Sequence, residues 1–274
     1  MKNFFILSRD DKTERKEVID LISDYITKNG GTCSYCLIDD VPYPVPQGTE
    51  CIITIGGDGT FVRSVQRGYE HKVPFIGCNL GHLGFLCEID KDNLIPSLDR
   101  LLAENLIPEN RMMLEGSVGD GKFIHAVNDV VLTCANNIQI ARLSVHVNDQ
   151  YLYSYNCDGI IISTPTGSTG YNLSAGGPIV DPKAKTILLT PVNAHALNAR
   201  SIVLGAEDVI KIVLEPRKRG NTKEKVEVKV DGATIGVLEV GDYTTVKCSK
   251  DTTQVYNLSN LSFVERLGKK MKDE

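Results

Sequence analysis

The sequence predicts an α/β fold in its first part and an all-β fold in the remainder. Strands and helices alternate over the first hundred residues, and the strands are buried apolar runs, which is typical of a doubly wound α/β sheet. After about Asn110 apolar and polar residues alternate singly and turn signals recur at short intervals, which favours antiparallel β-structure. We therefore expect an N-terminal domain over residues 1–105 and a C-terminal domain over residues 106–252. The tail, about residues 253–274, can return to the first domain.

Five elements of the first domain follow from residue patterns. Residues 3–7 form an apolar run that predicts a short buried strand. Apolar residues at helical spacing over 18–26, stopped by Asn29-Gly30-Gly31, predict a helix. The β-branched run 51–55 and the run 74–78 predict two further strands, and the leucines spaced over 94–102 predict a second helix.

The second domain is predicted from single alternation and turns. Residues 143–147, 210–214 and 226–230 alternate apolar and polar side chains, and Asp231-Gly232 offers a turn after the last of these runs. Residues 158–165 form a strand that ends in a long glycine-rich loop. Residues 269–272 are mostly lysine and are expected to be a solvated tail.

Composition and charge exclude several classes of protein. The chain has 274 residues, of which 42% are hydrophobic and 24% charged, so general disorder is excluded. Its 30 basic and 35 acidic residues give a net charge of −5, which argues against a non-specific nucleic-acid binder. No apolar run approaches the roughly 20 residues of a membrane helix, and the N-terminus does not resemble a secretory signal. A cytoplasmic protein is expected.

Cys33 and Cys36 have the C-x-x-C spacing of a redox or zinc site. No second pair of cysteines or histidines at suitable spacing completes four zinc ligands. We therefore interpret these residues, like the other six cysteines, as reduced small apolar side chains.

The first of three glycine-rich segments, Gly56-Gly57-Asp58-Gly59-Thr60, directly follows a predicted strand. Glycines at such a turn let backbone N–H groups approach a phosphate, and a following helix N-terminus favours anions. A carboxylate in this setting is unusual, and Asp58 is a candidate for orienting or deprotonating an alcohol. The alternative is a plain turn with a capping aspartate. The segment is neither a P-loop nor G-x-G-x-x-G, since Val62 stands at the last glycine position.

The other two segments also follow predicted strands. Residues 78–86, which include His82, come after the strand 74–78, so this turn and the first are expected to face one crevice at the carboxyl ends of parallel strands. Residues 166–178 alternate small hydroxyl residues and glycines around Tyr171. Such a loop offers many hydrogen bonds and one stacking ring, which suits a nucleotide; a long flexible loop is the alternative.

Together these segments resemble the NAD kinase family over residues 50–232. The resemblance rests on an ordered set: Gly56–Thr60, Asn79–Leu86, Asn128-Asp129, Asp158, Thr164–Pro178, Thr190-Pro191, His195, Arg200 and Asp231-Gly232. The first motif is shared with lipid kinases and phosphofructokinases, whereas the long loop in this order and spacing is specific. The resemblance implies transfer of the γ-phosphate of ATP to the 2′-hydroxyl of the adenosine ribose of NAD. It also implies a Rossmann-like N-terminal domain and an all-β C-terminal domain.

The resemblance implies roles for individual residues. Asp58 matches the catalytic proton acceptor, Asp158 a residue near the nicotinamide amide, and Tyr171 a residue beside a base. Asn128-Asp129 matches a pair usually written Asn-Glu, here with a carboxylate one methylene shorter. The implied phosphate side comprises Gly56, Gly57, Gly59 and Thr60, and the implied NAD-binding residues are Asp58, Gly59, Arg63, Asn128, Asp129, Asn156, Asp158, Thr169, Gly170, Tyr171, Asn172, Leu173, Ser174 and Asn193.

The resemblance also implies a divalent cation and an oligomer. No dense cluster of basic residues and no dedicated ligand cluster is visible in the sequence, so Mg²⁺ held largely by the ATP phosphates is expected. A homodimer or homotetramer is expected as well. Two alternatives are a lipid or sugar kinase that shares the first turn and a non-catalytic NAD(P)-sensing regulator. The phosphate-donor range, the choice between NAD and NADH, and feedback by NADP(H) stay open.

Overall fold

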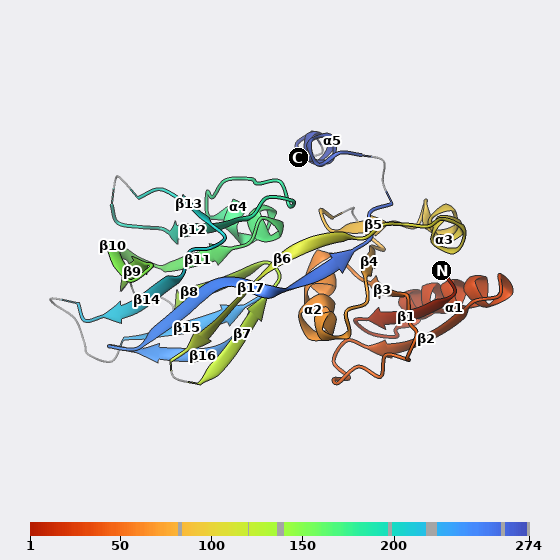
Figure 1. The fold of residues 1–274 in the computed structure, drawn as a ribbon, viewed down its shortest axis with the longest axis horizontal. Helices are drawn as coiled ribbons and strands as arrows, with labels where there is room; N and C mark the ends of the chain where they lie inside the picture. The colour runs from red at the N-terminus through yellow and green to blue at the C-terminus, as the bar shows by residue number, and fades with distance from the viewer. Residues whose placement is uncertain are drawn as a thin grey trace. The chain divides into compact units, whose positions relative to one another are not determined.

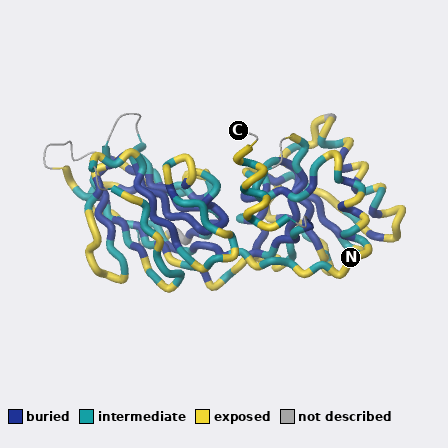
Figure 2. The backbone as a smooth tube through the Cα atoms, turned by 90° about the horizontal axis from the view of Figure 1, so that it is seen from above, coloured by how far each residue is buried: buried dark blue, intermediate teal, exposed yellow. Residues whose placement is uncertain are grey.

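A computed structural model describes residues 1–81, 84–119, 121–135, 140–196, 199–217, 224–258 and 261–272. The chain divides into two compact units (Figure 1): Met1–Arg111 with Thr253–Glu274, and Met112–Thr252. Each unit has its own buried interior beneath exposed loops (Figure 2). The end of the chain therefore belongs to the first unit.

The first unit is built on a parallel sheet. Its strands lie in the order β5, β4, β3, β1, β2, and the last residue of β17, Val255, pairs with Phe75 of β4. The elements are β1 (Asn3–Ser8), α1 (Thr13–Lys28), β2 (Thr32–Leu37), β3 (Cys51–Ile55), α2 (Asp58–Gly68), the short 3-10 helix η1 (Tyr69–His71), β4 (Phe75–Cys78), β5 (Cys87–Ile89), α3 (Leu94–Ala103) and α5 (Phe263–Lys270).

Helices cover both faces of this sheet. On one face Ile53 and Ile76 share a core with Ile22 of α1 and Leu98 of α3. On the other, the ring of Phe75 meets the ring of Phe61 from α2, with centroids 6.5 Å apart. Side chains alternate between the two faces of a strand, so helices on both sides leave β3 and β4 buried throughout. This arrangement is the predicted doubly wound α/β fold.

The second unit consists of two sheets. One has the order β13, β12, β11, β8, β15, β16, with antiparallel pairing throughout, and the other contains β10, β9, β14 and β17 together with β6 and β7. The elements are β6 (Glu109–Val118), β7 (Lys122–Ala126), β8 (Asp129–Cys134), β9 (Ala141–Val147), β10 (Gln150–Cys157), β11 (Gly159–Ser163), η2 (Thr166–Thr169), α4 (Tyr171–Ser174), β12 (Thr186–Val192), β13 (Ile202–Gly205), β14 (Ile210–Glu215), β15 (Lys225–Val230), β16 (Ala233–Glu239) and β17 (Tyr243–Val255).

The core of the second unit follows from single alternation. Every second residue of β14 and of β15 is buried, and both sets join one hydrophobic cluster. The strand β11 is buried along its whole length, between β8 and β12. The predicted antiparallel β domain is confirmed by this pairing.

The strand β2 and the helix α5 are among the elements of the first unit that were not expected from the sequence. The strand β2 lies at the edge of the sheet and none of its residues is buried, so it shows no apolar run. The prediction of a solvated tail at Lys269–Lys272 was wrong in part: Lys269 and Lys270 form the last turn of α5. A capping box begins that helix, because the Ser262 hydroxyl accepts from the Glu265 N–H while the Glu265 carboxylate accepts from the Ser262 N–H.

Candidate functional site

The first glycine-rich segment is the turn from β3 into α2. Gly56 has φ of +150°, and a Cβ there would lie 2.5 Å from the Thr60 hydroxyl oxygen, so the turn requires glycine at this position. The N–H groups of Thr60 and Phe61 bond the Gly57 carbonyl and close the first turn of the helix. Asp58 is thereby the first residue of α2, at the end of the helix that favours negative charge.

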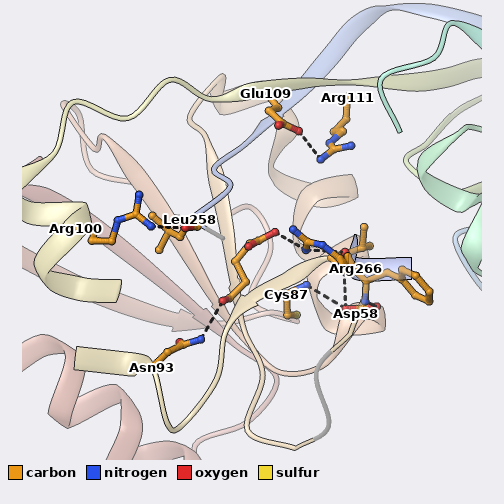
Figure 3. Close-up of polar contacts among 11 residues, drawn as sticks. Asp58, Cys87, Asn93, Arg100, Glu109, Arg111, Leu258 and Arg266 are labelled. Atoms are coloured by element: carbon orange, nitrogen blue, oxygen red, sulfur yellow. Dashed lines mark hydrogen bonds and ion pairs between the residues drawn. The ribbon is translucent and has the colours of Figure 1, made fainter. Parts of the chain in front are cut away.

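The second glycine-rich segment contacts Asp58 (Figure 3). The Asp58 carboxylate accepts hydrogen bonds from three consecutive backbone N–H groups: Phe85 at 2.7 Å, and Leu86 and Cys87 at 3.2 Å each. A Cβ on Gly84 would lie 1.8 Å from Asp58 Oδ1, so only glycine permits this approach. His82, which the sequence singled out in this segment, lies outside the described residues.

Arg63 lies on α2 and forms an ion pair with Asp39, at 2.8 Å. Arg67, one turn further along, also pairs with Asp39 at 2.8 Å and donates to the Ile38 carbonyl. The hydrogen bond from Arg67 and the charges of Arg63, Arg67 and Arg9 lower the pKa of the Asp39 carboxyl. Two guanidinium groups therefore contact one carboxylate, an arrangement that the sequence does not reveal because Asp39 lies 24 residues before Arg63.

In the second unit, Asp231 holds the backbone that leads into β8. Its carboxylate accepts from the N–H groups of Val127 and Asn128, at 2.8 Å each, and of Asp129, at 3.1 Å. This use of the Asp231-Gly232 turn was not foreseen from the sequence. It fixes Asn128 and Asp129, two predicted NAD-binding residues, at the start of β8.

Asp129 itself is a buried carboxyl group, 6% exposed. Burial, and then the nearby charge of Asp231, raises its pKa to about 7. Burial also raises the pKa of Asp231, to about 6, against the opposing effect of its three N–H donors. The Asp129 carboxyl therefore holds its proton to a higher pH than an exposed aspartate does.

The third glycine-rich segment forms η2 and α4 and is anchored to the same backbone. The Asn128 carbonyl accepts from the N–H of Thr164 and the hydroxyl of Ser163. A Cβ on Gly167 would lie 2.2 Å from that carbonyl oxygen, which explains the glycine. The structure therefore brings the loop 166–177 and the Asn128-Asp129 pair together, as the prediction of a common pocket requires.

The six predicted loop residues Thr169–Ser174 do not all point the same way. Tyr171 is 48% exposed, and Leu173 and Ser174 are exposed beside it. Asn172 is fully buried, and its amide nitrogen donates to the carbonyls of Ser168 and Pro178. Its amide oxygen accepts from the Thr190 hydroxyl at 2.7 Å. The Asn172 side chain is thus engaged inside the loop, while Tyr171 faces solvent.

Asp158 lies at the other end of β11 from the loop. Its carboxylate accepts from the Asn193 amide at 2.9 Å, and Asn193 holds a left-handed conformation with φ of +48°. Asn156 is exposed, and its carbonyl accepts from the N–H of His195. The five residues of β11 span about 16 Å, so Asp158, Asn193 and Asn156 form a second group, apart from the residues around Asn128.

The described residues contain neither a cluster of three metal ligands nor a membrane-crossing helix. There, no three His, Cys, Asp or Glu side chains are arranged to hold a metal ion, and the Asp129–Asp231 pair offers only two carboxylates. Within the same ranges, no helix has both the length and the apolar character needed to cross a membrane.

Comparison with known proteins decides the family. The ATP-NAD kinase N-terminal domain matches residues 10–106, and the ATP-NAD kinase C-terminal domain matches residues 127–258. An NAD kinase from Agathobacter rectalis is 41% identical over 99% of both chains. The chain belongs to the NAD kinase family. Another relative, the NAD kinase of Lachnoclostridium phytofermentans, is 36% identical over the full length of both chains.

Solved structures of NAD kinases share the fold. Yeast NADH kinase complexed with NADH superposes with a TM-score of 0.86 at 21% identity, covering 99% of this chain and 88% of the other. An NAD kinase from Archaeoglobus fulgidus in complex with ATP gives a TM-score of 0.76 at 20% identity, covering 99% of both chains. The family's two-domain architecture thus accounts for both units of this chain.

Proposed function

We propose that the chain transfers the γ-phosphate of ATP to the 2′-hydroxyl of the adenosine ribose of NAD, yielding NADP and ADP. Membership of the NAD kinase family supports the reaction. The observation that carries the site is Asp58, a carboxylate held by three backbone N–H groups at the start of α2, in a turn of small residues. This is the setting in which a carboxylate can meet both a hydroxyl group and a phosphate.

Asp58 acts as the proton acceptor and orienter for the attacking hydroxyl. Within the described residues, Oδ1 accepts two of the three backbone hydrogen bonds and Oδ2 accepts one. A carboxylate oxygen has about two acceptor positions, so Oδ2 keeps one for the ribose hydroxyl. The backbone holds the carboxylate in one orientation, and alignment of the attacking oxygen contributes much of the catalysis of phosphoryl transfer.

Gly56, Gly57, Gly59 and Thr60 form the proposed phosphate side. The N-terminus of α2 presents N–H groups and a favourable dipole to an anion. Arg63 and Arg67 bring two guanidinium groups to the same helix, and both pair with Asp39. Mg²⁺ would be held mainly by the ATP phosphates, whose charge it would neutralise when bound.

The NAD-binding residues of the second unit form two groups at the ends of β11. Tyr171 offers an exposed ring for a base, beside the hydroxyls of Thr169 and Ser174 and the backbone of Gly170 and Leu173. Asp158, bonded to Asn193, offers a carboxylate to the carboxamide of nicotinamide. An extended dinucleotide is long enough for its two ends to need separate groups of this kind.

The test is formation of NADP from NAD, ATP and Mg²⁺ by the wild type and by Asp58→Asn. The asparagine is of equal size but cannot accept the proton, so turnover should fall about 10²- to 10⁴-fold, while the melting temperature and NAD affinity stay close to wild type. Asp20→Asn is a matched control, because Asp20 is an exposed carboxylate on α1 paired only with Lys16 at 2.7 Å among its recorded contacts. It should leave turnover unchanged.

A turnover above about a tenth of wild type in Asp58→Asn would remove Asp58 from the catalytic role. NAD binding with no NADP formed by the wild type would favour the sensing regulator, and phosphorylation of a lipid or sugar instead of NAD would favour the other kinase class. A cytoplasmic location and a homodimer or homotetramer complete the proposal. The oligomeric state rests on the family resemblance, and the location rests on the expectation from the sequence.

A further inference from the structure

The C-terminal helix α5 contacts the segment that holds Asp58. The Arg266 guanidinium donates to the Phe85 carbonyl at 3.3 Å and forms an ion pair with the Glu88 carboxylate. Both partners are nearly covered, at 12% exposure for the Arg266 side chain and 7% for Glu88. The Lys270 ammonium lies 5.0 Å from the centre of the Phe85 ring. Two side chains of α5, one turn apart, thus reach the same short segment.

This contact is not a by-product of core packing. None of the residues of α5 is buried, and Val264 is 72% exposed. A helix of eight residues is marginal by itself in water. The capping box at Ser262 and the contacts with residues 85–88 are therefore prominent among the interactions that hold α5 in place.

A single peptide residue links α5 to Asp58. The N–H of Phe85 donates to Asp58 Oδ2, and the carbonyl of Phe85 accepts from Arg266. The next two N–H groups, of Leu86 and Cys87, donate to Asp58 Oδ1, and Glu88 follows directly. Arg266 therefore contacts this segment at two points, the Phe85 carbonyl and the Glu88 side chain. The N–H groups of Leu86 and Cys87 lie between these points, and the third donor is the N–H of Phe85 itself.

We propose that Arg266 is a positioning residue, which fixes residues 85–88 so that their N–H groups orient the Asp58 carboxylate for the ribose hydroxyl. The inference rests on the proposed function of Asp58. The segment needs such support, since it follows Gly84 and includes only the start of the three-residue strand β5. A displacement of about 1 Å at a reacting group can cost about 10²-fold in rate. Loss of the Arg266 contacts should therefore lower turnover without removing any substrate contact.

The experiment compares Arg266→Gln, Arg266→Lys and the control Lys269→Gln, alone and combined with Asp58→Asn. Lys269 is an exposed residue of the same helix, and its change removes the same charge. Arg266→Gln should lower kcat about ten- to a hundred-fold, with KM for NAD and ATP within about three-fold. Arg266→Lys keeps the charge that faces Glu88 and should recover part of kcat, whereas Lys269→Gln should match wild type.

The double variant separates positioning from general destabilisation. If Arg266 acts through Asp58, Arg266→Gln should change the residual rate of Asp58→Asn less than about two-fold, since coupled residues are not additive. Equal losses in both backgrounds would overturn the inference and leave a structural role. Wild-type kcat in Arg266→Gln would also overturn it.

Amide hydrogen exchange gives a readout that does not depend on activity. The N–H groups of Phe85, Leu86 and Cys87 should exchange at least several-fold faster in Arg266→Gln than in wild type, and those of β3 should be unaffected. Unchanged exchange at these three amides would show that Arg266 does not hold residues 85–88 in place. If the wild type forms no NADP, the proposed function fails, and exchange still decides whether Arg266 holds this segment.

Discussion

The glycines of the two turns near Asp58 differ in what requires them. At Gly56 the backbone conformation excludes a side chain, and at Gly84 the Asp58 carboxylate occupies the space. Gly57 and Gly59 are different, because among the described residues a Cβ at either position would meet no atom within 4 Å beyond its chain neighbours and its own helix, and neither has a positive φ. Packing within the chain does not require glycine at these two positions, which agrees with a role in close approach to a phosphate.

Gly59→Ala should therefore lower activity without harming the fold. Alanine is favoured over glycine in a helix by about 1 kcal/mol, so the melting temperature should stay the same or rise slightly. The KM for ATP should rise about ten-fold or more, by analogy with one lost hydrogen bond to a charged group. Steady-state kinetics and thermal unfolding measure the two effects.

Two further alanine variants frame this result. Gly121→Ala places a methyl group in equally open space on the second unit and should change neither the KM for ATP nor the melting temperature. Gly84→Ala should lower both activity and melting temperature, since the methyl group would displace Asp58. Wild-type kinetics in Gly59→Ala would mean that no phosphate approaches this turn closely.

At the scale of elements, the loop of η2 and α4 divides its residues between structure and binding. Tyr171→Ala should weaken NAD binding about ten-fold, because base–aromatic stacking contributes roughly 1–3 kcal/mol, and should leave the unfolding free energy within about 0.5 kcal/mol of wild type.

Asp158→Ala should weaken the binding of NAD more than the binding of AMP, since only NAD carries the carboxamide. Calorimetric titrations with both ligands measure these differences.

A change at Asn172, the residue next to Tyr171, should lower stability. Asn172→Ala would remove the amide donor to the Ser168 and Pro178 carbonyls and one partner of the Thr190 hydroxyl, which keeps its contact with Ser201. The expected cost is about 1–3 kcal/mol in unfolding free energy. NAD affinity unchanged in both Tyr171→Ala and Asp158→Ala would show that the loop is structural and that the dinucleotide binds elsewhere.

The strand β2 gives the C-x-x-C pair its geometry. Residues three apart on a strand point to opposite faces and lie about 10 Å apart, beyond the roughly 7 Å limit for a disulfide. Burial raises the pKa of both thiols, that of Cys36 to about 11, so neither is a reactive thiolate at neutral pH. The double change Cys33→Ser, Cys36→Ser should leave turnover within a few-fold. One equivalent of zinc in purified wild type, lost in the double variant, would contradict this prediction.

At the scale of the whole molecule, each unit carries its own core, and the buried acids of the second unit make its stability depend on pH. A carboxyl group whose folded pKa is raised binds its proton more tightly when folded. Its stabilising effect is therefore greatest at low pH and is lost as pH rises from about 4, the unfolded value, to about 7, the folded value of Asp129.

Asp129→Asn should flatten this part of the pH profile of unfolding free energy, by an amount on the order of a few kcal/mol between pH 4 and pH 8. The chain has no tryptophan, so urea unfolding is best followed by far-UV circular dichroism. Asp181→Asn is a suitable comparison, because Asp181 is an exposed carboxyl whose change should leave the slope intact. A wild-type slope in Asp129→Asn would show that Asp129 is ionised throughout this range.

The sequence by itself determined the fold class and the family. Buried β-branched runs such as 51–55 and single alternation such as 226–230 report local burial, so these strands could be read residue by residue. The edge strand β2 and the helix α5 were not predicted, because elements without buried residues show little apolar periodicity in the sequence. The Ser262-x-x-Glu265 capping box was the one cue that could have located α5.

Only the tertiary structure decided which residues meet. Asp58 and its donors at 85–87 are separated by 27 or more residues, Asp231 and Asn128 by about a hundred, and Arg266 and Phe85 by 181. Such contacts depend on strand order and on the return of the chain end to the first unit, and neither leaves a local pattern in the sequence. The structure also decided that Asn172 is buried while its neighbour Tyr171 is exposed. Which of two adjacent loop residues is buried depends on what packs against the loop, and the sequence of the motif does not show this.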